Sequence, residues 1–213
     1  MYRIKSIEKT GSRFVVKVSG DGIEAGFAET YLVAGEFFLP LGVNDGDMID
    51  DASLEALSSA SDLTAAVSKA LDALSYSVLS RRALTEKLRF KYRIDKETAE
   101  RAADYAVKRG YLDEDAQAKD IAERCVRGKL WGKRRIAAEL YSKGYPREVA
   151  ETAADSIPDG SYAAALEKLI DKKAKTAPAD GAEHNRLVSS LIRLGHSPSA
   201  VKEALAERFG EEI

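Results

Sequence analysis

The segment RRALTEKL, residues 81–88, decides the fold of this chain, because its pattern returns twice at a nearly constant interval. The related segments are RRIAAEL, residues 134–140, and NRLVSSL, residues 185–191. Each segment contains two aliphatic residues four positions apart, so both lie on one face of a helix. The last leucines of successive segments are 52 and then 51 residues apart. An internal period of this length predicts a repeat array.

A second motif follows each of these segments, and its spacing of four predicts another helix in every repeat. Its three copies are Ala99, Ala103 and Val107; Val149, Ala153 and Ile157; and Val201, Leu205 and Phe209. One unit of such an array buries its apolar face only against its neighbours, and arrays mostly present surfaces to partners. We therefore predict a mainly α fold of three tandem three-helix repeats in an extended, curved array.

The first 50 residues have a different character and predict a small β-rich domain. The run RFVVKV, residues 13–18, has high strand propensity. With the turn residues 10–12 before it, it predicts a hairpin with a loop of about three residues. Another turn is expected at Asp21-Gly22, and residues 37–39 are expected to fill the core. The predicted domains are the β-rich domain, residues 1–50; the first repeat with a lead-in helix, 51–115; the second repeat, 116–161; and the third, 162–213.

Several polar residues and one glycine predict where helices begin and end. Ser80, Asp95, Asp113 and Ser197 each precede a helical pattern, and their side chains can accept hydrogen bonds from the first free amides. Gly110 stands where a glycine commonly follows the last helical residue.

Composition favours an ordinary globular protein of the cytoplasm. The chain has 213 residues, of which 45% are apolar and 32% charged. No stretch approaches the roughly 18 apolar residues of a membrane span, and the N-terminal segment has no apolar core of a signal peptide. The one cysteine, Cys125, permits no disulfide within the chain and fits a reducing compartment. We expect a cytoplasmic protein that contacts no membrane.

The net charge of −2 conceals two clusters of positive charge. Residues 81–93 contain six basic residues and one acidic residue, and residues 124–135 contain six basic residues and no acidic one. We call these segments the first and second basic windows. They occupy equivalent places in the first two repeats, beside the second helix of each, which indicates a shared binding role. The candidate partner-binding residues are Arg81, Arg82, Lys87, Arg89, Arg124, Arg127, Lys129, Trp131, Lys133, Arg134 and Arg135.

Trp131 has two interpretations. A lone tryptophan is usually a core residue, and here it would fill the gap between the first two repeats. Alternatively, its position between Gly128 and Gly132 in a basic segment would suit an exposed interface anchor. We favour the core interpretation but keep Trp131 among the candidate partner-binding residues.

The sequence contains few groups suited to catalysis. The two histidines, His184 and His196, have no cysteine or carboxylate at metal-ligand spacing. Cys125 lies on a helix face beside small apolar residues, which is typical of a core thiol. There is no phosphate-binding loop, G-x-S-x-G motif or paired cysteine motif. We expect no metal, no cofactor and no enzymatic activity.

Four local motifs are similar to the RecX family of bacterial recombination regulators. The resemblance spans residues 66–213. It is carried by ALDALSY (70–76) followed by Ser80-Arg81-Arg82; by GYLDE (110–114); by Gly128, Trp131-Gly132, Arg135-Ile136 and Glu139-Leu140; and by KGY (143–145). Gln117 stands where the family commonly has an aromatic residue, and the third repeat keeps the pattern but little of the sequence.

The resemblance implies a non-enzymatic regulator that binds the RecA recombinase in its filament on DNA. RecX proteins suppress the ATPase and strand-exchange activities of RecA, and some bind DNA directly. The basic residues would then lie on a concave face turned toward the filament, and the protein would act as a monomer. The alternative is an autonomous helical module that binds single- or double-stranded DNA without RecA.

Overall fold

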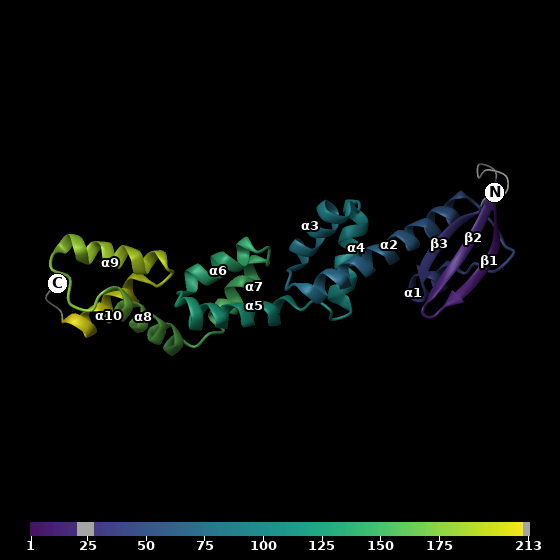
Figure 1. The fold of residues 1–213 in the computed structure, drawn as a ribbon. Helices are drawn as coiled ribbons and strands as arrows, with labels where there is room; N and C mark the ends of the chain where they lie inside the picture. Colours follow the sequence, from purple (N-terminus) through teal and green to yellow (C-terminus); the bar gives the residue numbers. More distant parts are fainter. Residues whose placement is uncertain (21–27, 211–213) are drawn as a thin grey trace. The chain divides into compact units, whose positions relative to one another are not determined.

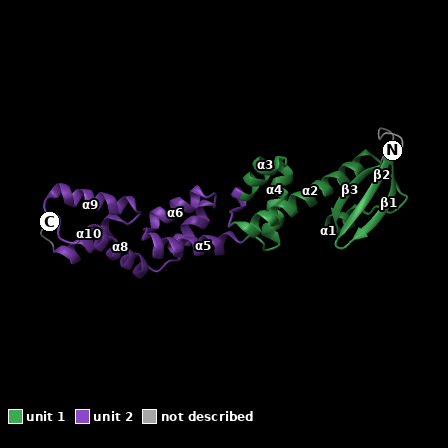
Figure 2. Cartoon of the chain, in the orientation of Figure 1, with its two compact units in different colours: residues 1–77, 84–112 green, residues 78–83, 113–213 purple. Residues whose placement is uncertain are grey.

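The computed structural model describes residues 1–20 and 28–210; the turn predicted at Asp21-Gly22 lies outside these ranges. The described chain is mainly helical with an N-terminal antiparallel sheet, which confirms the predicted fold class (Figure 1). It divides into two compact units (Figure 2): unit 1 holds residues 1–77 and 84–112, and unit 2 holds residues 78–83 and 113–213. The domain limits at residues 50, 115 and 161 stay a prediction. No helix in the described ranges combines the length and apolar character needed to cross a bilayer.

Unit 1 begins with four strands in the order β3-β2-β1-β4. The predicted hairpin joins β1 to β2, with two loop residues, Gly11 and Ser12, rather than about three. The elements of this part of the chain are β1 (Tyr2–Thr10), β2 (Arg13–Gly20), β3 (Glu29–Ala34), α1 (Gly35–Phe38), a 3₁₀ turn (Leu39–Leu41), β4 (Met48–Ile49), α2 (Asp51–Tyr76), α3 (Arg81–Tyr92, of which residues 81–83 belong to unit 2) and α4 (Lys96–Lys108).

Helix α2 covers the outer edge of strand β3. The outward amide of Leu32 on edge strand β3 donates to the Ser61 hydroxyl at 3.3 Å, and that of Ala34 donates to the Thr64 hydroxyl at 2.9 Å. Two hydroxyls of α2 thereby satisfy an edge that would otherwise be open to another strand. One buried cluster joins the sheet to this helix: Ile4, Val16, Val18, Val33, Phe38 and Ile49 with Leu57 and Ala60.

Unit 2 is helical after its first residues. Its helices share one buried cluster, to which α6 contributes Ile136 and Leu140 and α9 contributes Leu187 and Leu191. The elements are α5 (Glu114–Arg124), a π-helical turn (Cys125–Lys129), α6 (Lys133–Ser142), α7 (Arg147–Asp155), α8 (Asp159–Lys173), α9 (Gly181–Arg193) and α10 (Pro198–Phe209).

The predicted helix signals are largely confirmed. The aliphatic pairs of the three related segments are all buried: Leu84, Leu88, Ile136, Leu140, Leu187 and Leu191. Each of the four predicted cap side chains accepts a hydrogen bond from the backbone amide three residues later: Ser80 from Ala83, Asp95 from Thr98, Asp113 from Ala116 and Ser197 from Ala200. Gly110 follows the end of α4 with a left-handed φ of 73°.

Two predicted core positions are wrong. Val107, the third member of its triplet, is 41% exposed, because Ala102 and Ala106 occupy the buried face of α4 instead. Leu39 is 69% exposed, whereas its neighbour Phe38 is buried and stacks on Phe14 with ring centroids 4.4 Å apart.

Candidate functional site

The second basic window joins α5 to α6 through an irregular segment. After α5, residues 125–129 form the π-helical turn, of which the first two residues are buried and the last three exposed. Leu130 then adopts a left-handed conformation with φ of 57°, and α6 begins at Lys133. π-Helical turns are frequent at functional sites. This one places Arg127 and Lys129 on the surface beside the start of α6.

Trp131 lies between two cations of the window. The Lys129 Nζ atom is 4.1 Å from the ring centroid, and the Arg135 Cζ atom is 5.0 Å from it. The ring is half-buried and packs against the core of unit 2. Contacts of this kind contribute about 0.5–1 kcal/mol each at exposed sites. Trp131 therefore packs on the core of unit 2 and also presents a surface with cations beside it, while its roles as a filler between the first two repeats and as an interface anchor stay predictions.

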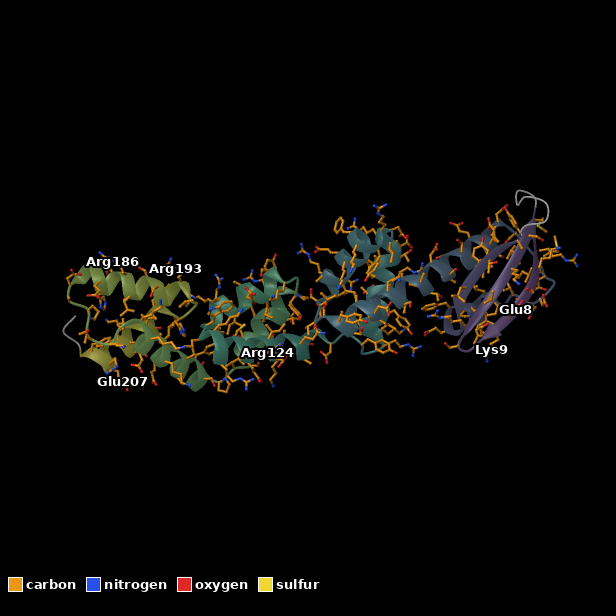
Figure 3. All side chains as sticks on the ribbon, viewed as in Figure 1. Glu8, Lys9, Arg124, Arg186, Arg193 and Glu207 are labelled. Carbon is orange, nitrogen blue, oxygen red and sulfur yellow. The ribbon has the colours of Figure 1, made fainter. Side chains whose placement is uncertain are left out.

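Two of the six cations in this window are neutralised by carboxylates. Arg124, labelled in Figure 3, pairs with Asp120 at 2.8 Å, and Lys133 pairs with Asp155 of α7. The other four form no ion pair with any residue in the ranges 1–20 and 28–210: Arg127, Lys129, Arg134 and Arg135. All four are exposed, so their charge is available to an external acidic group.

The basic clusters occupy an electrostatically unfavourable place on their helices. Residues 133–135 form the first turn of α6, where the helix dipole is positive, and this turn contains no acidic residue. The first turn of α3 begins with Arg81 and Arg82 and also has no acidic residue. A cation at this end costs roughly 0.3–1 kcal/mol. Acidic groups of the chain lie at both places, since Asp155 pairs with Lys133 and a Glu114 carboxylate oxygen accepts from the Arg81 amide.

Helix α3 carries most of the first basic window. Leu84 and Leu88 form its buried face, and helical geometry places Arg82 and Arg89 roughly opposite them. Arg82 is exposed and Arg89 is half-exposed. Lys91 and Arg93 of this window are exposed as well, so the partner role of its cations stays a prediction.

The structure distributes the first window over both units. Arg81 and Arg82 belong to unit 2, together with the whole second window, whereas Lys87 and Arg89 belong to unit 1. The backbone amide of Arg81 donates to a carboxylate oxygen of Glu114 at 2.9 Å, which caps the start of α3.

Sequence reasoning missed Phe90. This residue is 75% exposed, and the Arg89 Cζ atom lies 5.3 Å from its ring centroid. The next pair repeats the arrangement, with Lys91 Nζ 5.4 Å from the centroid of Tyr92. The signal was present in RFKYR, residues 89–93, where aromatic residues alternate with cations.

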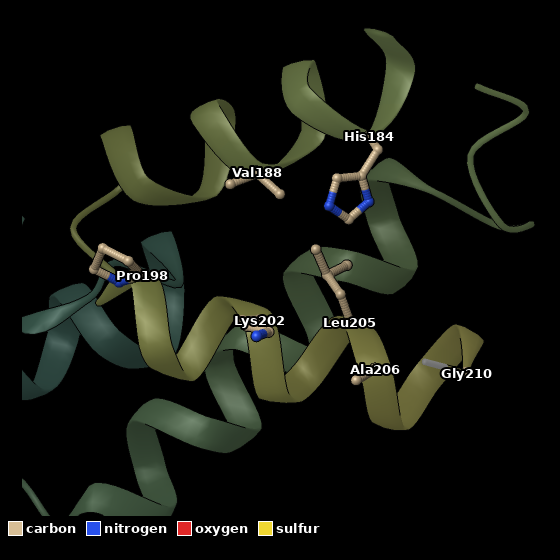
Figure 4. A pocket seen from close by; sticks show the side chains of 7 residues that line it. All are labelled: His184, Val188, Pro198, Lys202, Leu205, Ala206 and Gly210. Atoms are coloured by element: carbon tan, nitrogen blue, oxygen red, sulfur yellow. The ribbon is translucent and has the colours of Figure 1, made fainter. Parts of the chain in front are cut away.

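Two of the cavities in unit 2 are lined by residues considered above for chemistry, Cys125 and His184. One of about 520 Å³ is lined partly by Cys125, Lys129 and Lys143. Burial raises the pKa of the Cys125 thiol, which suits the expected core role. The other, of about 580 Å³, lies between α9 and α10 (Figure 4), with lining residues His184, Val188, Pro198, Lys202, Leu205, Ala206 and Gly210. Among the described residues, no three His, Cys, Asp or Glu side chains group as metal ligands.

Comparison with solved structures identifies the fold. The crystal structure of a regulatory protein RecX matches with a TM-score of 0.76 at 20% identity, covering 95% of this chain and 100% of that one. RecX from Lactobacillus salivarius matches with a TM-score of 0.63 at 21% identity, covering 68% and 96%. This chain has the RecX fold. No family model matches it, and no curated protein matches it by sequence. The RecX fold agrees with the resemblance carried by the sequence motifs.

Proposed function

We propose that this protein is a RecX-type regulator that binds the RecA filament and inhibits its ATPase and strand-exchange activities. The observation that carries the proposal is the RecX fold over 95% of the chain. The GYLDE segment, residues 110–114, supports it independently. The proposed contact surface includes the four unpaired cations of the second window and Trp131.

The mechanism is electrostatic docking. A RecA–DNA filament presents phosphates and acidic side chains, and unpaired arginines and lysines that meet them release counterions. Trp131 supplies an aromatic contact of the kind enriched in the centres of interfaces. A body docked in the filament groove hinders entry of a second DNA and slows subunit rearrangement and ATP turnover. The protein acts as a monomer without a cofactor.

RecA ATPase on single-stranded DNA tests this function. Wild-type protein lowers the turnover, and the variant R127A/K129A/R134A/R135A loses most of the inhibition. The matched control K5A/K9A/K108A/K119A removes four exposed lysines elsewhere, none of which forms an ion pair with a described residue, and keeps the inhibition. Unchanged turnover at saturating wild-type protein would contradict the proposal. Equal loss in both variants would reject the second window as the contact surface.

An autonomous DNA-binding module is the second candidate. The observation that favours it is the half-buried Trp131 ring with cations beside it, because single-stranded nucleic acids stack bases on aromatic and arginine surfaces. Binding is then measured without RecA across a salt series. For single-stranded DNA, the variant R127A/K129A/R134A/R135A removes four phosphate contacts and reduces the slope of log K against log salt by about 3. Absence of binding without RecA would reject this candidate.

A further inference from the structure

The described part of the third repeat makes three hydrogen bonds to the segment that carries the second basic window. All come from the turn between α9 and α10, residues 194–196, and all reach residues 130–134. The bonds are Gly132 N to Leu194 O at 2.8 Å, Arg134 N to Gly195 O at 3.3 Å, and His196 Nε2 to Leu130 O at 3.0 Å. His196 is buried, and its Nε2 atom carries the proton because a carbonyl only accepts.

Two glycines allow this turn to approach so closely. Gly195 has φ of 95°, and a Cβ there would lie 2.7 Å from Gly132 O and overlap the amide of Arg135. A Cβ on Gly132 would likewise overlap the backbone of Gly195. The turn thus contacts the backbone on both sides of Trp131.

An equivalent contact occurs one repeat earlier. Gly144, with φ of 89°, lies in the turn after α6, and a Cβ there would lie 2.8 Å from Ser80 Oγ. The Ser80 hydroxyl donates to Lys143 O at 2.8 Å. Gly144 and Gly195 are 51 residues apart, and Ser80 and Gly132 are 52 apart, which is the period of the repeats. In both places, the turn of one repeat holds the start of the second helix of the preceding repeat, where the basic residues lie.

We propose that Gly195 and His196 are positioning residues, which hold Trp131 and its neighbouring cations in the geometry that meets the partner. The bonds to Leu130 and Gly132 fix the backbone immediately before and after Trp131. The third repeat therefore influences partner binding indirectly, by positioning residues of the second repeat. The identity of the partner rests on the proposed function, whereas the positioning is tested without any partner.

Trp131 itself reports the geometry, because it is the only tryptophan of the chain. His196→Ala and Gly195→Ala each shift its emission to longer wavelength and increase acrylamide quenching, under conditions where far-UV circular dichroism shows an unchanged helical content. His196→Gln, whose amide can donate to Leu130 O, restores the wild-type spectrum. Gly110→Ala is the matched control for the backbone strain of Gly195→Ala, since Gly110 has φ of 73° and open space around its Cα. It leaves the spectrum unchanged.

Binding to RecA filaments gives the second readout. His196→Ala weakens it about fivefold, the equivalent of one hydrogen bond of about 1 kcal/mol. His196→Gln restores most of the affinity. The proposal is overturned if both His196→Ala and Gly195→Ala lower thermal stability while the emission and quenching of Trp131 stay at wild-type values. If the wild-type protein binds no RecA, the proposed function fails, and the spectra still decide the positioning.

Discussion

The environment of His196 links the stability of the protein to pH near neutrality. Burial lowers the pKa of its imidazole below the ordinary value of 6.5, although the hydrogen bond to Leu130 O acts in the opposite direction. The unfolded chain therefore takes up this proton at a higher pH than the folded chain, and protonation favours unfolding. The contribution of His196 is complete above pH 6.5 and is lost as the pH falls through the folded pKa.

Thermal unfolding at several pH values measures this effect. We expect the melting temperature of the wild type to fall as the pH decreases from about 7 through the folded pKa of His196, and His196→Gln to lose the part of this fall that His196 causes. Carboxylates titrate mostly below this window, so they contribute little to the difference. Parallel profiles for the two proteins would contradict the assignment.

The candidate site was only partly predictable at the scale of residues. Charge clustering revealed the six cations of the second window, and the spacing of four between Asp120 and Arg124 was visible in the sequence. The pairing of Lys133 with Asp155 was not, because tertiary packing of α6 and α7 brings these residues together. The half-burial of Trp131 depends on the preceding π-helical turn and on Leu130, whose left-handed conformation is unusual for a residue with a Cβ.

At the scale of elements, aliphatic pairs predicted their helices better than the longer triplets did. A step of four residues advances about 40° around a helix, so a third member lies about 80° from the first. Val107 therefore lies at the edge of the helix face that contains Ala99. The buried face is completed by Ala102 and Ala106 instead. A pair separated by a single step of four stays within one face, which explains the burial of both Ile136 and Leu140 in α6.

Truncation of a buried aliphatic residue tests this reading of α6. Leu140→Ala removes a side chain that is 0% exposed, and we expect a loss of about 2–5 kcal/mol in the free energy of unfolding. Tyr141→Ala is the matched control, because the next residue of the same helix is 60% exposed. Tyr141→Ala should lower the free energy of unfolding much less than Leu140→Ala does. Urea unfolding measures the loss in both variants. Similar losses would show that the buried face of α6 is misassigned.

At the scale of the whole molecule, the sheet depends on a helix that follows it in the sequence. A unit of about 50 residues can bury only a small core of its own. Helix α2 supplies Leu57 and Ala60 to that core, and its hydroxyls cap the edge of β3. Glu36 adds a second connection within unit 1: it accepts from the Tyr105 hydroxyl at 2.6 Å and pairs with Arg109, both on or beside α4. Periodicity alone could not predict these contacts, because they join segments far apart in the chain.

Deletion of residues 1–50 should therefore destabilise unit 1 and spare unit 2. The deletion exposes the sheet-facing residues of α2 and removes the partner of Tyr105 and Arg109, whereas Trp131 keeps the core of its own unit. We expect circular dichroism to show a helical transition at lower urea than in the full-length protein. The Trp131 fluorescence transition should keep its midpoint. Leu57→Ala in the full-length chain perturbs the same core less severely than the deletion. We expect it to lower the free energy of unfolding of unit 1 alone, by about 2–5 kcal/mol. An equal shift of the Trp131 transition would show that the two units unfold as one cooperative body.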